Sequence, residues 1–258
     1  GGMDTLTGDD VANTWTITSP NTGTLTGITS GFSNIENLIG GSNNDSFTFS
    51  DNATIVSING GSSGINTINL AAYDTAVNVT LSSSTAAGVN GSTAGSTNPI
   101  SGTFSNITSL IAPATGSLSN SLTLTSNDTI VTLLSSVNTH GFAGNATDAN
   151  VTLAFTNFDN ITGAGADDTL IGENTPNTWS ITSNNGGTLF DEIDTLTFSG
   201  FENLTGGTDD DSFIFDDGVG IDGNLNGGAG GTNLLDLSSY ASSTNIVLSG
   251  HSVYGVAG

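Results

Sequence analysis

Apolar and polar residues alternate with a period of two through most of the chain. Trp15 and Ile17, and later Val77, Val79 and Leu81, place apolar side chains on every second residue. Alternation of this kind is typical of β-strands with one buried face, and clusters of Gly, Asn, Asp and Ser separate the runs as turns would. Because no stretch sustains the 3.6-residue period of an amphipathic helix, the pattern predicts an all-β chain with almost no helix.

Long segments of this pattern occur twice. The segment DTLTGDDVANTWTITS at 4–19 returns 164 residues later as DTLIGENTPNTWSITS at 168–183. Self-similarity over such a distance indicates a tandem repeat. We therefore divide the chain into a first repeat unit, residues 1–166, and a partial second unit, residues 167–258, that continues the same structure.

A shorter motif, called the echo below, recurs inside the long unit as similar eight-residue segments that begin with Phe. The segment FSNIENLI at Phe32 returns as FSNITSLI at Phe104, FTNFDNIT at Phe155 and FSGFENLT at Phe198. The spacings of 72, 51 and 43 residues are unequal, which degenerate coils joined by loops of different length would explain. Segment Ser82–Gly102 fits the alternation least and is expected to be a low-complexity loop or a poorly packed coil.

Strands of this length could form a sandwich of immunoglobulin type or a parallel β-helix. A pair of glycines followed by Asn or Asp and a short strand recurs along the chain, and such a turn could reverse the backbone at the same place in every coil. This favours a parallel β-helix, or β-solenoid, built of degenerate coils. Phe, Leu, Ile and Val from successive coils would fill its interior, with Trp15 and Trp179 at equivalent levels of the two units.

The charge of the chain narrows the choice of partners. It has 24 acidic residues and no Lys or Arg, so its formal net charge is −24. Nucleic acids and anionic membrane surfaces are bound through basic residues, so neither is an expected partner. No apolar run approaches the roughly 18 residues that span a bilayer, so no membrane insertion is expected. Divalent cations are the partners that such a chain would attract.

Three Gly-rich turns resemble the nonapeptide of the RTX (repeats-in-toxin) family. They are GGSNNDSFT at Gly40–Thr48, GGTDDDSFI at Gly206–Ile214 and the weaker GAGADDTLI at Gly163–Ile171. In that family an aspartate and the turn backbone bind calcium while an apolar residue packs inward. The resemblance implies the calcium ligands Asp45, Asp211 and Asp168, helped by Asn43, Asn44, Asp209 and Asp210. These motifs are isolated rather than tandem, and calcium takes six to eight oxygens, so plain Gly and Asx turns are the alternative.

The wider pattern of ENLTGG, DDSF and LDLSSY resembles the tandem repeats of giant bacterial surface proteins related to RTX adhesins and filamentous haemagglutinins. This resemblance implies secretion, a location outside the cell or on its surface, and a structural or adhesive role. The partners would be further copies of the repeat, either in the same chain or stacked end to end. The chain begins and ends in mid-pattern, so we expect a longer parent protein.

Two other functions fit parts of the sequence. A polysaccharide-acting β-helix enzyme needs a pair of carboxylates, and Asp191, Glu192 and Asp194 lie close in sequence. However, no basic residue is present for lyase chemistry, and His140 and His251 stand in no catalytic constellation. A Thr-rich face, as in TWTITS, would suit ice or crystal binding, although strand propensity explains Thr equally well. We expect no enzymatic activity.

Overall fold

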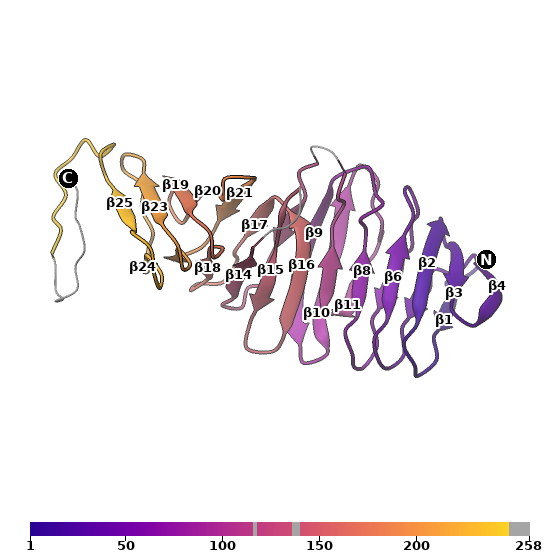
Figure 1. Cartoon of the computed structure of the whole chain (residues 1–258). Coiled ribbons are helices and arrows are strands. Elements are labelled where there is room, and N and C mark those ends of the chain that lie inside the picture. Colours follow the sequence, from indigo (N-terminus) through magenta and orange to yellow (C-terminus); the bar gives the residue numbers. More distant parts are fainter. Residues whose placement is uncertain (116–117, 136–139, 248–258) are drawn as a thin grey trace.

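The computed structural model describes residues 1–115, 118–135 and 140–247. These residues form 25 strands and no helix, which confirms the all-β prediction (Figure 1). The last part of the second repeat unit, residues 248–258, lies outside the described residues. Within the described ranges, no helix is long and apolar enough to cross a membrane.

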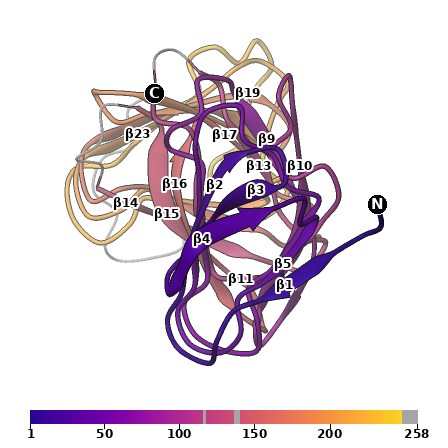
Figure 2. The same ribbon diagram turned by 90° about the vertical axis from the view of Figure 1, so that its right-hand side faces the viewer.

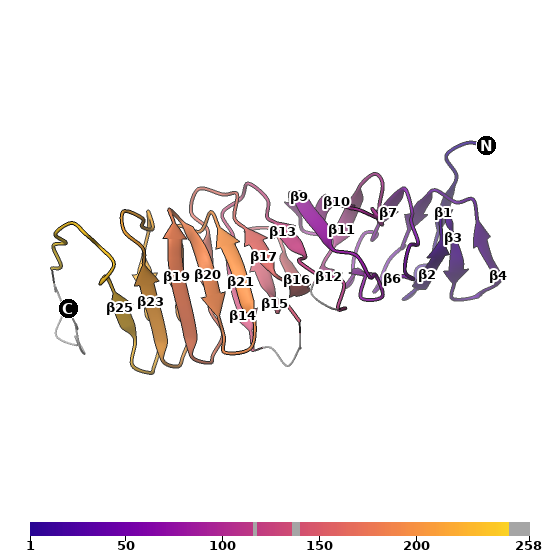
Figure 3. The same ribbon diagram turned by 90° about the horizontal axis from the view of Figure 1, so that it is seen from above.

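The strands form two large and mostly parallel sheets that run the length of an elongated molecule (Figures 1 and 3). The thirteen-stranded sheet has the order β1 (Thr5–Thr7), β5 (Asn37–Ile39), β7 (Ser57–Asn59), β11 (Phe104–Ile107), β10 (Gly88–Gly95), β9 (Val77–Thr85), β13 (Ser121–Thr123), β17 (Asn160–Thr162), β21 (Thr195–Ser199), β20 (Gly186–Phe190), β19 (Asn177–Ser183), β23 (Asp211–Phe215) and β25 (Leu234–Asp236). The twelve-stranded sheet has the order β24 (Leu225–Asn226), β22 (Asn203–Thr205), β18 (Thr169–Ile171), β14 (Ile130–Leu134), β15 (Phe142–Thr147), β16 (Thr152–Phe158), β12 (Ser109–Ile111), β8 (Thr67–Asn69), β6 (Ser46–Phe49), β2 (Thr14–Ser19), β3 (Thr22–Leu25) and β4 (Ile28–Ser33).

The chain passes back and forth between the two sheets. From β5 to β8, each successive strand belongs to the opposite sheet from the one before. Strand β5 pairs in parallel with β7, Asn37 opposite Ser57, and β6 pairs in parallel with β8, Ser46 opposite Thr67. We call one strand from each sheet, with its connections, a circuit. Figure 2 looks at the end that carries the N-terminus and shows later strands stacked behind the first.

Four antiparallel meanders of three strands interrupt the parallel pairing. They are β2–β4, β9–β11, β14–β16 and β19–β21, and they fall alternately in the twelve-stranded and the thirteen-stranded sheet. In the β9–β11 meander, the first strand pairs with β13 ahead of it and the last strand pairs with β7 behind it. Each meander therefore advances along the molecule and then turns back by two strands.

The echo of phenylalanine-containing segments marks the last strand of each meander and the strand that follows it. In every meander this phenylalanine lies opposite a glycine of the central strand, the pairs being Gly23 and Phe32, Gly91 and Phe104, Gly144 and Phe155, and Gly187 and Phe198. Four described strands separate the first two meanders and two separate each later pair, so the number of strands accounts for the longest spacing. The difference between 51 and 43 residues reflects the lengths of strands and loops.

The prediction of a loop or poorly packed coil at Ser82–Gly102 is wrong. Strand β9 continues to Thr85, and β10 pairs with it along its whole length. Val89, Gly91 and Thr93 are buried on one face of β10. The small residues that suggested a loop are needed here because an added Cβ at Gly91 would lie 2.7 Å from the ring of the phenylalanine opposite.

One continuous apolar interior runs between the sheets. Val77, Val79 and Leu81 point into it, as predicted. Trp15 stacks on Phe47 with ring centroids 5.7 Å apart, and Trp179 stacks on Phe213 at 5.4 Å, with interplanar angles of 14° and 18°. All four rings are buried. This confirms that the two tryptophans occupy equivalent levels in the two repeat units.

The two copies of the repeat lie in exchanged sheets. Strands β1 to β8 correspond in order to β18 to β25, as the segments TWTITS in β2 and NTWSITS in β19 illustrate. Strand β1 belongs to the thirteen-stranded sheet, but β18 belongs to the twelve-stranded sheet, and the same exchange holds for β2 and β19. The repeat therefore contains an odd number of passes between the sheets.

Candidate metal centre

The three aspartates that resemble RTX ligands all stand where a Gly-rich turn meets a strand. Asp45 directly precedes β6, Asp168 directly precedes β18, and Asp211 is the first residue of β23. Their exposed fractions are 1%, 0% and 0%. The apolar residues two positions later, which the motif predicts to be inside, are also buried, as Phe47, Leu170 and Phe213. The carboxyl groups are therefore enclosed between circuits.

Asp45 belongs to a ladder of side chains that joins successive circuits. The backbone amide and the Nδ2 of Asn13 both donate to Asp45 Oδ1, each at 2.9 Å. The amide of Asp45 in turn donates to Asn66 Oδ1 at 3.2 Å, and the amide of Asn66 donates to Thr108 Oγ1 at 2.9 Å. We call each of these side chains, one per circuit, a rung of the ladder. Each rung after Asn13 accepts a hydrogen bond from the backbone amide of a neighbouring rung, and a buried amide without such a bond would destabilise the fold.

The second repeat unit has the same ladder. Asn177 donates to Asp211 Oδ1 from its amide at 3.1 Å and from Nδ2 at 2.8 Å, and the amide of Asp211 donates to Asn233 Oδ1 at 3.0 Å. Equivalent residues make equivalent hydrogen bonds in both copies. The repeated aspartate therefore has a structural role in the stacking of circuits.

The second carboxyl oxygen of two of these aspartates has no partner. Oδ2 of Asp45 and Oδ2 of Asp211 are buried without a hydrogen bond. On the preceding circuit, the atom that corresponds to Asp45 Oδ2 is Nδ2 of Asn13, which donates to the carbonyl of Gly40 at 3.0 Å. An added Cβ on Gly40 would lie 2.4 Å from Asp45 Oδ2 and 2.5 Å from the carbonyl of Gly60, so two acceptors lie close together here.

A protonated carboxyl group would supply the donor that asparagine supplies on the other rungs. Burial raises the pKa of Asp45 above the ordinary aspartate value of 3.8, although hydrogen bonds from Asn13 oppose the shift. Burial likewise raises the pKa of Asp211; bonds from Asn177 oppose this, and the nearby carboxylates of Asp209 and Asp210 add to it. Both shifts favour the neutral acid.

Asp168 differs because both of its oxygens have partners. Thr129 donates its amide to Oδ1 at 2.7 Å, and Gly165 donates its amide to Oδ2 at 2.8 Å. Burial raises the pKa of Asp168, and these amide bonds oppose the shift. Both oxygens of Asp168 thus already accept hydrogen bonds, so this position lacks the unpaired acceptor oxygen of Asp45 and Asp211.

The other predicted calcium ligands, Asn43, Asn44, Asp209 and Asp210, are exposed on the outer part of the turns. The side chains of Asn44 and Asp210 each accept a backbone amide from the next circuit, at 2.8 and 2.6 Å. Each motif is thus divided between one enclosed carboxyl group and polar side chains that face outward. A calcium ion at these turns would meet the outward groups first.

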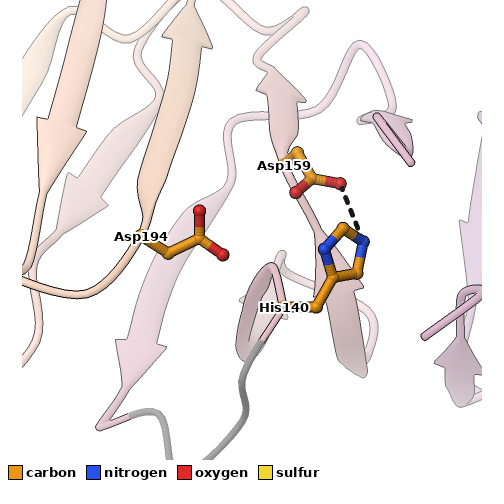
Figure 4. Close-up of side chains that lie close together, drawn as sticks. All are labelled: His140, Asp159 and Asp194. Carbon is orange, nitrogen blue, oxygen red and sulfur yellow. Dashed lines mark ion pairs between the residues drawn. The ribbon is translucent and has the colours of Figure 1, made fainter. Parts of the chain in front are cut away.

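A separate group of potential ligands lies where loops of two meanders meet (Figure 4). His140 precedes β15, Asp159 connects β16 to β17, and Asp194 precedes β21. Each offers a ligand atom, and the three atoms lie within 4.8 Å of one another. Among the described residues, no other three His, Cys, Asp or Glu side chains meet this criterion. Sequence reasoning missed the group because the fold alone brings its members together.

The carboxylates considered for catalysis, Asp191, Glu192 and Asp194, lie in the loop before β21. Asp191 is buried, and its Oδ1 accepts the amides of Ile193 at 2.9 Å and Asp194 at 2.7 Å. Glu192 occupies the turn with a φ of 76°, in the left-handed region. Asp191 therefore stabilises the turn before β21, and its Oδ1 is already engaged.

No protein-family model, curated protein or solved structure matches this chain significantly.

Proposed function

We propose that the chain is a stretch of parallel β-solenoid and serves as a structural repeat segment of a secreted bacterial surface fibre or adhesin. The observation that carries this proposal is the continuous apolar interior, which extends from the first copy of the repeat into the described part of the second. In such an arrangement each circuit packs against its two neighbours, so a further copy adds length. A repeat that adds length suits a stalk or fibre.

Close stacking of the Gly-rich turns supports the solenoid. Gly41 and Gly61 lie at equivalent points of successive circuits and have φ values of 112° and 105°, which L side chains rarely adopt. A Cβ on Gly61 would lie 2.0 Å from the carbonyl of Gly41. Glycine therefore permits the contact between turns on which regular stacking depends.

The exposed apolar residues of β25 support extension by further circuits. Leu235 is 41% exposed, whereas Ile68, the matching residue of the first copy, is fully buried. Ile68 is covered because β12 pairs with β8 on its far side. A further circuit, from the same chain or from another copy, would cover Leu235 in the same way and pair with the edge of β25, which no described strand occupies.

The charge supports a location outside the cell and stabilisation by calcium. A net charge of −24 without Lys or Arg leaves external cations as the counterions of the carboxylates. The outward groups of the RTX-like turns, Asp209 and Asp210 above all, are the oxygen ligands that calcium prefers. We propose a structural role without catalysis.

Immunogold labelling of intact cells that produce the protein tests this proposal. Antibodies raised against the purified chain are expected to label the surface or extended filaments without permeabilisation. An antibody against a cytoplasmic protein, which should label permeabilised cells only, is the control. Labelling by the chain-specific antibody that requires permeabilisation would contradict a surface fibre.

A further inference from the structure

We propose that His140, Asp159 and Asp194 bind one divalent transition-metal ion, of the Zn²⁺ type, that clamps the junction between the two repeat units. His140 and Asp159 belong to the first unit and Asp194 belongs to the second. Strands β15 and β16 lie in the twelve-stranded sheet, whereas β17 and β21 lie in the thirteen-stranded sheet. A metal ion here would join two units and two sheets at once.

The histidine lacks the partner that its burial requires. His140 Nε2 is buried without a hydrogen bond, and the side chain is 13% exposed. Its distance to Asp159 Oδ2 is 3.8 Å, too long for a hydrogen bond. Figure 4 shows the imidazole ring next to the carboxylate of Asp159, with the carboxylate of Asp194 farther to its left. A buried ring nitrogen without a hydrogen bond is therefore available as a ligand.

Backbone amides hold both carboxylates in place. Asn120 donates its amide to Asp159 Oδ2 at 2.8 Å, and Gly141 donates its amide to Asp194 Oδ2 at 2.7 Å. Because Gly141 follows His140 directly, this bond ties the backbone beside His140 to Asp194. Each carboxylate keeps further lone pairs for an ion, and hydrogen bonds of this kind orient metal ligands in known sites.

The electrostatics of the group call for a cation. Asp159 and Asp194 bring two carboxyl oxygens within 4.8 Å of one another and of a ring nitrogen of His140. Elsewhere in proteins Lys or Arg could neutralise such a pair, but this chain has neither. An external divalent ion would balance both carboxylates and would also occupy the vacant coordination position of the imidazole.

The ligand set selects the class of ion. One imidazole nitrogen with two carboxylate oxygens suits zinc and its first-row neighbours, whereas calcium prefers oxygen ligands only. With ligand distances near 2.1 Å, tetrahedral zinc needs ligand atoms roughly 3.4 Å apart. The observed spread of up to 4.8 Å requires a small inward movement of the side chains. Solvent would complete the coordination.

The junction is a specific place for such a clamp. The position of the first unit that matches Asp194 lies in the uncharged stretch at Gly27 and Ile28. Gly27 lies in the connection between β3 and β4, and Ile28 is the first residue of β4. The described part of the chain thus provides the full ligand set only where the first unit meets the second.

Titration calorimetry with Zn²⁺ on the chelator-treated full chain tests the proposal, in buffer with excess calcium to occupy general carboxylate sites. We expect one equivalent to bind, with affinity at least about tenfold weaker in His140→Asn and in Asp194→Asn. The matched control is His251→Asn, which removes the only other histidine and should leave binding unchanged. Zinc binding that is absent, or that depends on His251 instead, would overturn the proposal.

A second measurement does not depend on how the variants fold. The ring resonances of the two histidines can be assigned by comparison with His251→Asn, and Zn²⁺ should shift the signals of His140 at one equivalent while magnesium leaves them in place. The visible absorption of bound Co²⁺ should appear at the same stoichiometry. Unchanged His140 resonances at saturating zinc would overturn the proposal in the folded native chain.

Discussion

Asp45 has the oxygen Oδ2 where Asn13 on the preceding circuit has the nitrogen Nδ2. This one difference decides whether the buried side chain can donate a hydrogen bond at that position. Asn13 Nδ2 donates to the carbonyl of Gly40, whereas Asp45 Oδ2 and Asp211 Oδ2 have no partner. A hydrogen bond made to a previously unpaired buried group is worth about 1 kcal/mol or more. Stability at these positions should therefore depend on protonation.

We predict that Asp45→Asn and Asp211→Asn each raise the free energy of unfolding at pH 7 by about 1 kcal/mol. The new amide would supply the missing donor while its oxygen keeps the bonds from Asn13 or Asn177. Asp168→Asn is the matched control and should lower the free energy of unfolding. Its side-chain NH2 group would face the backbone N–H of Gly165, so two donors would meet without an acceptor. Urea unfolding at pH 7 measures all three changes, and stabilisation by Asp168→Asn would contradict this account.

The same rungs predict how stability depends on pH. Because the pKa of Asp45 and that of Asp211 are raised in the folded state, their contribution to stability is complete below the ordinary value of 3.8 and is lost as the pH rises through the raised values. The double variant with asparagine at both positions should lose this part of the pH dependence. Urea unfolding of both chains from pH 3.5 to 7.5 tests this, and parallel profiles would contradict it.

The sequence motifs predicted the positions of these aspartates and the burial of Phe47 and Phe213. They did not predict that the carboxyl groups face inward. A Gly-rich turn followed by aspartate fixes the residue type and the strand start, but the direction of the carboxyl group depends on Asn13 and Asn177, which are 32 and 34 residues away.

At the scale of elements, the meanders depend on the pairing of glycine with phenylalanine. An added Cβ on Gly144 would lie 2.5 Å from the ring of Phe155 and 2.6 Å from the carbonyl of Thr132. The carbonyl belongs to the backbone of the neighbouring strand β14, so it cannot move aside without disturbing the pairing.

We predict that Gly144→Ala destabilises the fold by roughly 1–3 kcal/mol, the usual cost of overpacking. Gly220→Ala is the matched control, since nothing lies within 4 Å of its added Cβ and its φ is not in the left-handed region. Thermal unfolding followed by circular dichroism compares the two variants. Equal melting temperatures for both would show that the contact does not limit the packing of the meander.

Alternation of apolar residues was enough to predict strands, because each strand needs only its own residues to bury one face. Meanders could not be predicted in this way. The central strand β10 packs Val89 and Gly91 inward. The space above Gly91 is filled by the ring of Phe104, which belongs to the next strand, β11. A segment rich in Gly and Ser was for this reason interpreted as a loop.

At the scale of the whole molecule, 24 carboxylates without basic residues repel one another, so any salt should stabilise the chain by screening. Calcium bound to the native state would add to this by mass action, about 2.7 kcal/mol at a hundredfold excess over Kd. The two effects differ in their dependence on particular carboxylates.

We predict that millimolar calcium raises the melting temperature more than magnesium or sodium chloride at the same ionic strength. Asp209→Asn combined with Asp210→Asn should reduce the calcium-specific increment. The matched control is Asp216→Asn with Asp217→Asn, which removes the same charge from exposed residues just after β23. Differential scanning calorimetry measures each increment, and an equal loss in both double variants would reduce the calcium effect to general screening.

The exchange of sheets between the two copies determines how a longer array would present its surface. If further units follow in the same register, a group carried by one unit lies on one side of the proposed fibre and its counterpart in the next unit lies on the other side. The true translational period is then two units, and identical sites alternate along opposite flanks. Such a fibre could be bridged to neighbours on both sides, which favours flat mats over twisted pairs.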